Sequence, residues 1–206
     1  MQIRYRGNKM KGFFKNHSYD VVTMLLHQLV LSMFGFALVL AAMKIDNNVL
    51  LNVTGVFSIL FYLVLLYMKA WDIGYKDKIS VEQGRKANNP LRGALISLCA
   101  NAINFVFAFL IMLNAFFPKV SFFETVGGFS QALCVIGQGM YAGLLTNQVG
   151  GAPLNTYWFV YFVTPIPAIL VCGLAYYFGL HDVKYTGFFH KNQYPESDRD
   201  PKRKGK

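Results

Sequence analysis

The feature that most constrains this chain is a series of five long apolar runs that are almost free of charged residues. They cover residues 21–43, 50–71, 94–117, 122–145 and 157–180. As a helix, each is long enough to cross a hydrocarbon core of about 30 Å, which takes about 20 residues. An unpaired charge at the bilayer centre costs about 2.5–3.5 kcal/mol on insertion scales, so charges are expected to avoid such runs. The sequence therefore predicts an all-α polytopic membrane protein, a bundle of about five hydrophobic helical segments.

The composition argues against a water-soluble fold. Hydrophobic residues make up 54% of the chain and charged residues only 15%, which is too apolar for a soluble domain. The net charge of +10 would suit nucleic acid, but the basic residues lie in short segments beside the apolar runs, so no nucleic-acid partner is expected. Cys99, Cys134 and Cys172 fall inside the runs without the spacing of metal ligands. We expect the lipid bilayer as the environment, with no metal and no cofactor.

Basic residues indicate the orientation of the chain. All but two of the 20 Lys and Arg residues lie at 1–20, 69–93 and 181–206; the exceptions are Lys44 and Lys119. Because basic residues near spans favour the cytoplasm, we expect a multi-pass cell-membrane protein with both termini inside. The predicted parts are a basic cytoplasmic segment 1–20, a transmembrane domain 21–180 with a basic cytoplasmic loop 72–93, and a flexible cytoplasmic tail 181–206. The basic loop and tail can also contact anionic lipid headgroups.

The number of crossings depends on the fourth run, residues 122–145. Five complete crossings would place the basic tail outside, whereas four crossings and one re-entrant or surface-lying segment keep it inside. The fourth run is glycine-rich, and irregular backbone is tolerated at membrane depth when protein surrounds it. Six crossings would leave almost no residues for loops. The fifth run should be kinked or broken at Pro165 and Pro167, which lack backbone donors.

Polar residues inside the runs are the candidate site. His27 and Gln28 lie in the first run, at a depth similar to that of Asn101 and Asn104 in the third, and His27 is predicted to be buried near Asn101. One interpretation is a polar lining for a substrate or proton path. The other, which we favour, is hydrogen bonding between helices, worth about 0.6 kcal/mol per bond. The candidates for either role are His27, Asn101, Asn104, Gln131 and Gln138.

Pairs of small residues four positions apart predict close helix packing. Such residues let backbones approach where apolar attraction between helices is weak. The pairs are Gly139 with Gly143, Gly128 with Ala132, and Ala37 with Ala41. We favour packing within the chain over docking of a partner, and we predict that Gly139 and Gly143 touch a neighbouring helix.

No catalytic signature accompanies these features. The sequence has no HExxH, no GxSxG and no phosphate-binding loop, and no pair of carboxylates lies inside an apolar run. The leading hypothesis is a non-enzymatic membrane component or partner-binding subunit that binds another membrane protein or a second copy. The alternative is a small-solute transporter or a substrate-binding membrane subunit, followed by an enzyme with an unfamiliar site. A closed bundle interior favours the first, and a polar cavity that reaches one membrane face favours the second.

Overall fold

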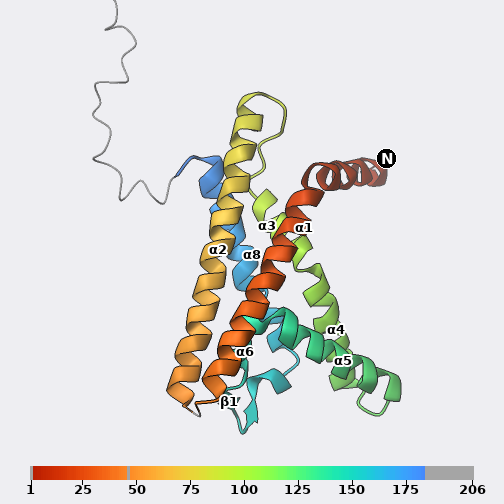
Figure 1. Ribbon diagram of the computed structural model, residues 1–206. Helices are drawn as coiled ribbons and strands as arrows, with labels where there is room; N and C mark the ends of the chain where they lie inside the picture. The colour runs from red at the N-terminus through yellow and green to blue at the C-terminus, as the bar shows by residue number, and fades with distance from the viewer. Residues whose placement is uncertain (1, 46, 184–206) are drawn as a thin grey trace, which may run out of the picture.

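Two long antiparallel helices form one side of the molecule (Figure 1). The structure is a computed structural model that describes residues 2–45 and 47–183, with side chains from His17 onward. α1 spans Gln2–Met43 and α2 spans Asn48–Glu82. Asn47 caps α2, because its side chain accepts hydrogen bonds from the backbone N–H groups of Val49 and Leu50.

Shorter elements complete the bundle. In chain order they are α3 (Arg92–Ala100), α4 (Ala102–Phe116), α5 (Ser121–Gly137), η1 (Gly139–Tyr141), α6 (Ala142–Leu145), β1 (Gln148–Val149), β2 (Ala152–Pro153), η2 (Leu154–Thr156), α7 (Val160–Val163) and α8 (Ile166–Leu180). The antiparallel β1–β2 hairpin is the one departure from the all-α prediction in the described part of the chain. Gly150 and Gly151 form its turn with φ angles of 64° and 86°, which suit glycine.

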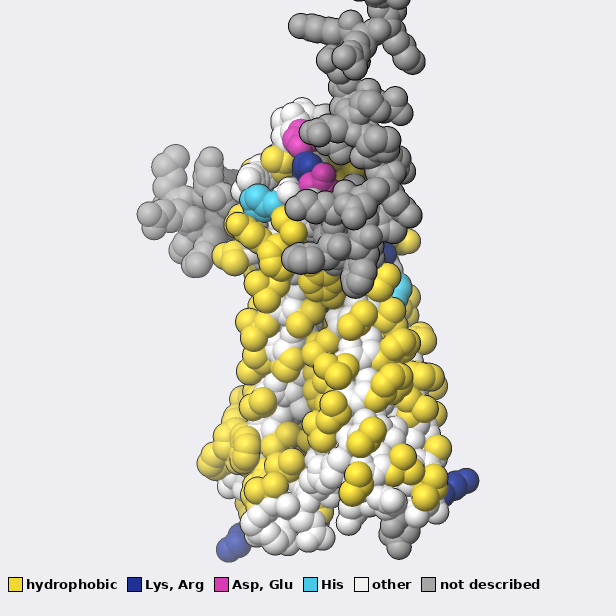
Figure 2. All heavy atoms as spheres, turned by 90° about the vertical axis from the view of Figure 1, so that its left-hand side faces the viewer, with side chains coloured by type: hydrophobic (Ala, Val, Ile, Leu, Met, Phe, Trp, Pro, Cys, Tyr) yellow, Lys and Arg dark blue, Asp and Glu magenta, His cyan; other side chains and the backbone are white. Residues whose placement is uncertain are grey.

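The helical spans account for most of the apolar runs. His17–Met43, Asn48–Glu82 and Val160–Leu180 are long and apolar enough to cross a membrane. The bent pair α3–α4 makes a fourth if its two helices, 52° apart, count as one span. On the face shown in Figure 2, hydrophobic side chains cover the middle of the molecule and charged side chains gather toward its ends. This is a helical protein built to be embedded in a membrane.

The fourth run does not form one continuous helix. α5 packs on α4, with Gly127 against the Asn114 side chain, and it ends against α1 at Ser32. The chain then returns through η1 and α6, where Gly143 lies against Gly55 near the start of α2. Segment 121–147 therefore leads from the end of α4 to the middle of α1, and back toward the α1–α2 connection (Figure 1).

The helix of the fifth run is interrupted close to its two prolines, as the sequence predicts. α7 ends at Val163 and α8 begins at Ile166, so the break falls at Thr164 and Pro165, and Pro167 lies in the first turn of α8. Proline is tolerated there because the first N–H groups of a helix have no intrahelical acceptor.

Glycines bring α2 and α8 into close contact. A Cβ added at Gly74 would collide with the carbonyl oxygen of Tyr176, and one at Gly179 would collide with that of Trp71. The larger hydrophobic cluster of the described residues fills the space between α2, α8, α1 and α3. The position of α8 is thus set by backbone contact as well as by side-chain packing.

Replacing Gly179 with alanine should destabilise the protein, since overpacking typically costs about 1–3 kcal/mol. Gly128 is the matched control, because a Cβ there would meet nothing within 4 Å. Gly128→Ala should be neutral or stabilising by up to about 1 kcal/mol from helix propensity. Thermal unfolding of the purified variants in detergent measures both effects. Equal melting temperatures would contradict the close α2–α8 contact.

Candidate functional site

The polar residues of the first and third runs meet through Gln28 and not through His27. The Gln28 Nε2 donates a hydrogen bond to the Asn101 Oδ1 at 2.7 Å, and the Asn104 Nδ2 donates to the same oxygen at 3.1 Å. All three side chains are buried. His27 is exposed, with its Nδ1 2.7 Å from the carbonyl oxygen of Thr23. The predicted burial of His27 against Asn101 is wrong, because equal depth does not fix direction and adjacent helix positions point about 100° apart.

A second polar group begins one turn further along α1, at Ser32. The Ser32 hydroxyl donates to the carbonyl oxygen of Ile136 and accepts a hydrogen bond from the Gly139 N–H at 2.6 Å. Gln138 precedes Gly139 in the chain, and its Oε1 accepts a hydrogen bond from the Thr164 hydroxyl. These contacts join α1, the end of α5 and the α7–α8 break.

Both polar groups lie where helices are interrupted. α3 gives way to α4 at Asn101, α5 ends before Gln138, and α7 ends before Thr164. Backbone groups freed at such breaks find no water in the hydrocarbon core, so the protein must satisfy them. Ser32 bonds two such backbone groups, the Ile136 carbonyl oxygen and the Gly139 N–H. The Asn101 Nδ2 adds a second hydrogen bond, 3.0 Å long, to the Ser97 carbonyl oxygen, which also accepts from the Asn101 backbone N–H. The polar side chains therefore support the breaks as well as linking the helices.

Among the described residues, several buried polar atoms have no hydrogen-bond partner, and three of them belong to residues of α1, η1 and the end of α5. They are the Gln28 Oε1, the Gln138 Nε2 and the Tyr141 hydroxyl. An unpaired buried polar group costs about 1–3 kcal/mol, so these atoms are suited to bind a further polar group. Gln131 is not part of this group of atoms. Its Nε2 donates a hydrogen bond to the Asn155 carbonyl oxygen at 2.9 Å.

The small-residue pairs are placed differently from one another. Gly139 lies against Ser32 and Phe36 of α1, and Gly143 lies against Gly55 of α2. They thus contact two different helices and do not form one helical face. The residues of the other two pairs are exposed on the outer surface: Ala37, Ala41, Gly128 and Ala132. The expectation that these two pairs pack within the chain is therefore wrong. The buried face of α1 instead carries Met24, Gln28, Ser32, Gly35, Val39 and Ala42.

A buried ion cluster at one end of the bundle was not predicted from the sequence. The Asp77 side chain of α2 is only 5% exposed. Lys86 donates to its Oδ1, while Arg92 and Tyr176 donate to its Oδ2 at 2.9 Å and 2.8 Å. The His17 Nε2 lies 3.9 Å from the same Oδ2. One carboxylate thus joins α1, α2, α3, α8 and the connection between α2 and α3.

The Asp77 carboxylate is stabilised in its charged form. Asp77 lies in the last two turns of α2, after the apolar stretch that ends at Met68. Lys86, Arg92 and Tyr176 all donate hydrogen bonds to this buried carboxylate, and two of these donors are cations, so the charged form is the one that the cluster stabilises. A buried charge of this kind is tolerated only when it is paired and hydrogen-bonded.

The sequence does carry one signal for this cluster. Hydrophobicity alone predicts a loop from residue 72, whereas α2 continues to Glu82. Buried positions recur along one face of α2 every three or four residues and include Asp77. They are Gly55, Ser58, Tyr62, Leu66, Ala70, Ile73, Gly74 and Asp77. Helical periodicity continued past Trp71 would have predicted that Asp77 is buried.

The fold and these polar groups define a helical integral membrane protein with interrupted spans. No group of three or more His, Cys, Asp or Glu side chains that could hold a metal ion occurs among the described residues. Comparison of the chain with protein-family models, curated proteins and solved structures found no match.

Replacing Asp77 with asparagine should lower the free energy of unfolding by about 3 kcal/mol, because Lys86 and Arg92 are left as partly buried, unpaired cations. Asp72→Asn is the matched control. Its ion pair with Lys76 on the same helix is exposed, with side-chain exposures of 43% and 69%, and such pairs contribute at most about 1 kcal/mol. Denaturant unfolding in detergent micelles measures both variants. Equal losses would show that the Asp77 cluster does not stabilise the bundle.

Proposed function

We propose that this chain is a non-catalytic membrane component that acts through its outer surface by binding a membrane protein or a second copy of itself. The observation that carries the proposal is that polar side chains in the interior form hydrogen bonds with one another and with the backbone. Gln28, Asn101 and Asn104 bond to one another, and Ser32 bonds to backbone at the end of α5. Groups engaged in this way support a closed interior and leave the outer surface for recognition.

The proposed arrangement has four crossings and one re-entrant segment, residues 121–147, with both termini in the cytoplasm. Contacts at both ends of this segment support it. At its start, the ring centroids of Phe117 and Phe123 lie 5.8 Å apart across the α4–α5 turn. At its end, the Asn147 Nδ2 donates to the Asn52 Oδ1 near the start of α2 at 2.6 Å. On this proposal the segment enters and leaves the membrane on the side that holds the α1–α2 connection.

A second candidate function is transport of a small polar solute. The unpartnered Gln28 Oε1, Gln138 Nε2 and Tyr141 hydroxyl favour it. Interrupted helices near the middle of the membrane also occur around the binding sites of transporters. On this proposal a solute or water would reach these atoms from one membrane face.

Single cysteines test the topology and the interior in one experiment, with an impermeant thiol reagent applied to intact cells. The native cysteines Cys99, Cys134 and Cys172 are first replaced by alanine. Cysteines at Asn47, Lys119 and Gln148 should then label, whereas one at Gln83 should label only after permeabilisation. Labelling at Lys119 but not at Gln148 would mean that α5 crosses the membrane completely.

The same background tests whether the interior is closed. Ser32→Cys and Ser97→Cys place a thiol of similar size at side chains that are fully buried. Because the thiolate is the reactive form, labelling needs water at the site. A closed bundle predicts no labelling of either cysteine from either face. Rapid labelling of Ser32→Cys from one face would reject the scaffold proposal in favour of transport.

A further inference from the structure

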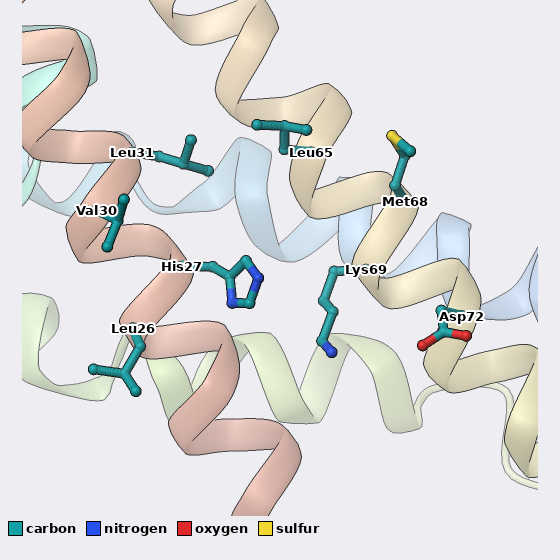
Figure 3. Close-up of a pocket in the computed structure, with 8 residues that line it drawn as sticks. All are labelled: Leu26, His27, Val30, Leu31, Leu65, Met68, Lys69 and Asp72. Atoms are coloured by element: carbon teal, nitrogen blue, oxygen red, sulfur yellow. The ribbon is translucent and has the colours of Figure 1, made fainter.

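A groove between α1 and α2 opens on the outside of the bundle. It has a volume of about 530 Å³, within the range of about 300–1,000 Å³ typical of small-molecule sites. Figure 3 shows His27 from α1 and Lys69 from α2 projecting into the space between the two helices. The lining residues are Leu26, His27, Val30, Leu31, Leu65, Met68, Lys69 and Asp72.

The groove changes from polar to apolar along its length. α1 and α2 are antiparallel, so Leu31 and Leu65 lie toward the centre of the apolar runs while Lys69 and Asp72 lie toward the end that carries the ion cluster. Lys69 is the first charged residue after the long apolar stretch of α2. This places its ammonium group near the boundary between acyl chains and headgroups.

The Lys69 charge has no counter-ion among the residues that the structure describes. Its ammonium forms no ion pair with any carboxylate in the part of the chain that the structure describes. Asp72, which also lines the groove, is instead paired with Lys76 at 2.6 Å. Because Asp72 is engaged with Lys76, Lys69 lacks a partner that would offset the loss of hydration of its charge in this mainly apolar groove.

We propose that this groove binds one anionic phospholipid, with its phosphate between Lys69 and His27 and an acyl chain along Val30, Leu31 and Leu65. The order of polar and apolar groups along the groove matches the order of headgroup and chain in a lipid of that leaflet. The Lys69 ammonium supplies donors that a phosphate accepts. The His27 ring, whose Nδ1 faces the Thr23 carbonyl oxygen, lines the headgroup end of the groove. This site lies beside the spans, apart from the basic loop and tail, and does not depend on whether the bundle interior is closed.

Native mass spectrometry of the full chain, titrated with phosphatidylglycerol or phosphatidylcholine, tests the proposal. The wild-type protein should bind phosphatidylglycerol more tightly by about fivefold, the effect of one lysine near a membrane surface. Lys69→Gln should abolish this preference. Lys44→Gln removes the same charge from the other end of α1 and should keep the preference. Loss of the preference in both variants, or in neither, would overturn the site.

A second pair of variants tests the acyl-chain part of the groove without changing charge. Val30 lines the groove and is 65% exposed, whereas Val64 is 56% exposed and lies outside it. Val30→Trp should fill the groove and weaken phosphatidylglycerol binding, while Val64→Trp should not. Equal binding by these two variants would contradict the proposal. A dimer that Val30→Trp abolishes and that lipid does not affect would assign the groove to a second copy of the chain instead.

Discussion

The rest of the structure depends on one buried carboxylate, that of Asp77. Its oxygens accept hydrogen bonds from Lys86, Arg92 and Tyr176, and His17 lies beside them. A buried ion pair adds little net stability compared with apolar packing, but it is costly to break, so it fixes which groups must meet. In this chain it sets the positions of α1, α3 and α8 around the end of α2.

Once that end is fixed, the close α2–α8 contact follows. Tyr176 binds Asp77 through its hydroxyl while its backbone lies against Gly74, one turn before Asp77 on α2. The two contacts require the same relative position of the helices. Deeper in the bundle, the described residues include no such buried charge, and α1 contacts its neighbours through Gln28 and Ser32. These amide and hydroxyl groups carry no charge. They can therefore form hydrogen bonds with the backbone N–H and C=O groups at helix breaks without the cost of burying an ion in hydrocarbon.

The general architecture could be predicted from the sequence because it follows from length and hydrophobicity. The apolar runs predict the long helices, and the prolines predict the break at Thr164 and Pro165. The direction in which each side chain points around its helix could not be predicted in the same way. His27 and Gln28 have nearly the same depth, and only the packing of α1 decides that Gln28 is buried. Ala37 and Ala41 are exposed for the same reason, since the buried face of α1 follows Gly35 and Val39.

The ion cluster escaped prediction because hydrophobicity alone places a span's end at the first charges. α2 continues well past Lys69 and Asp72, and the partners of Asp77 come from residues far apart in the sequence. Those pairings depend on tertiary structure, which no local pattern in this chain specifies. The same limit applies to the groove, because Lys69 and His27 come together only when α1 and α2 pack.

A double-mutant cycle between Asp77→Asn and Arg92→Gln tests the central claim most directly. The free energy of unfolding of both single variants and of the double variant can be measured by denaturant titration in micelles. If the pair is coupled, the double variant should lose about 2 kcal/mol less stability than the two single losses added together, because removing both charges leaves no unpaired ion between them. Additivity within about 0.5 kcal/mol would contradict the account, since Asp77 and Arg92 would then stabilise the bundle independently.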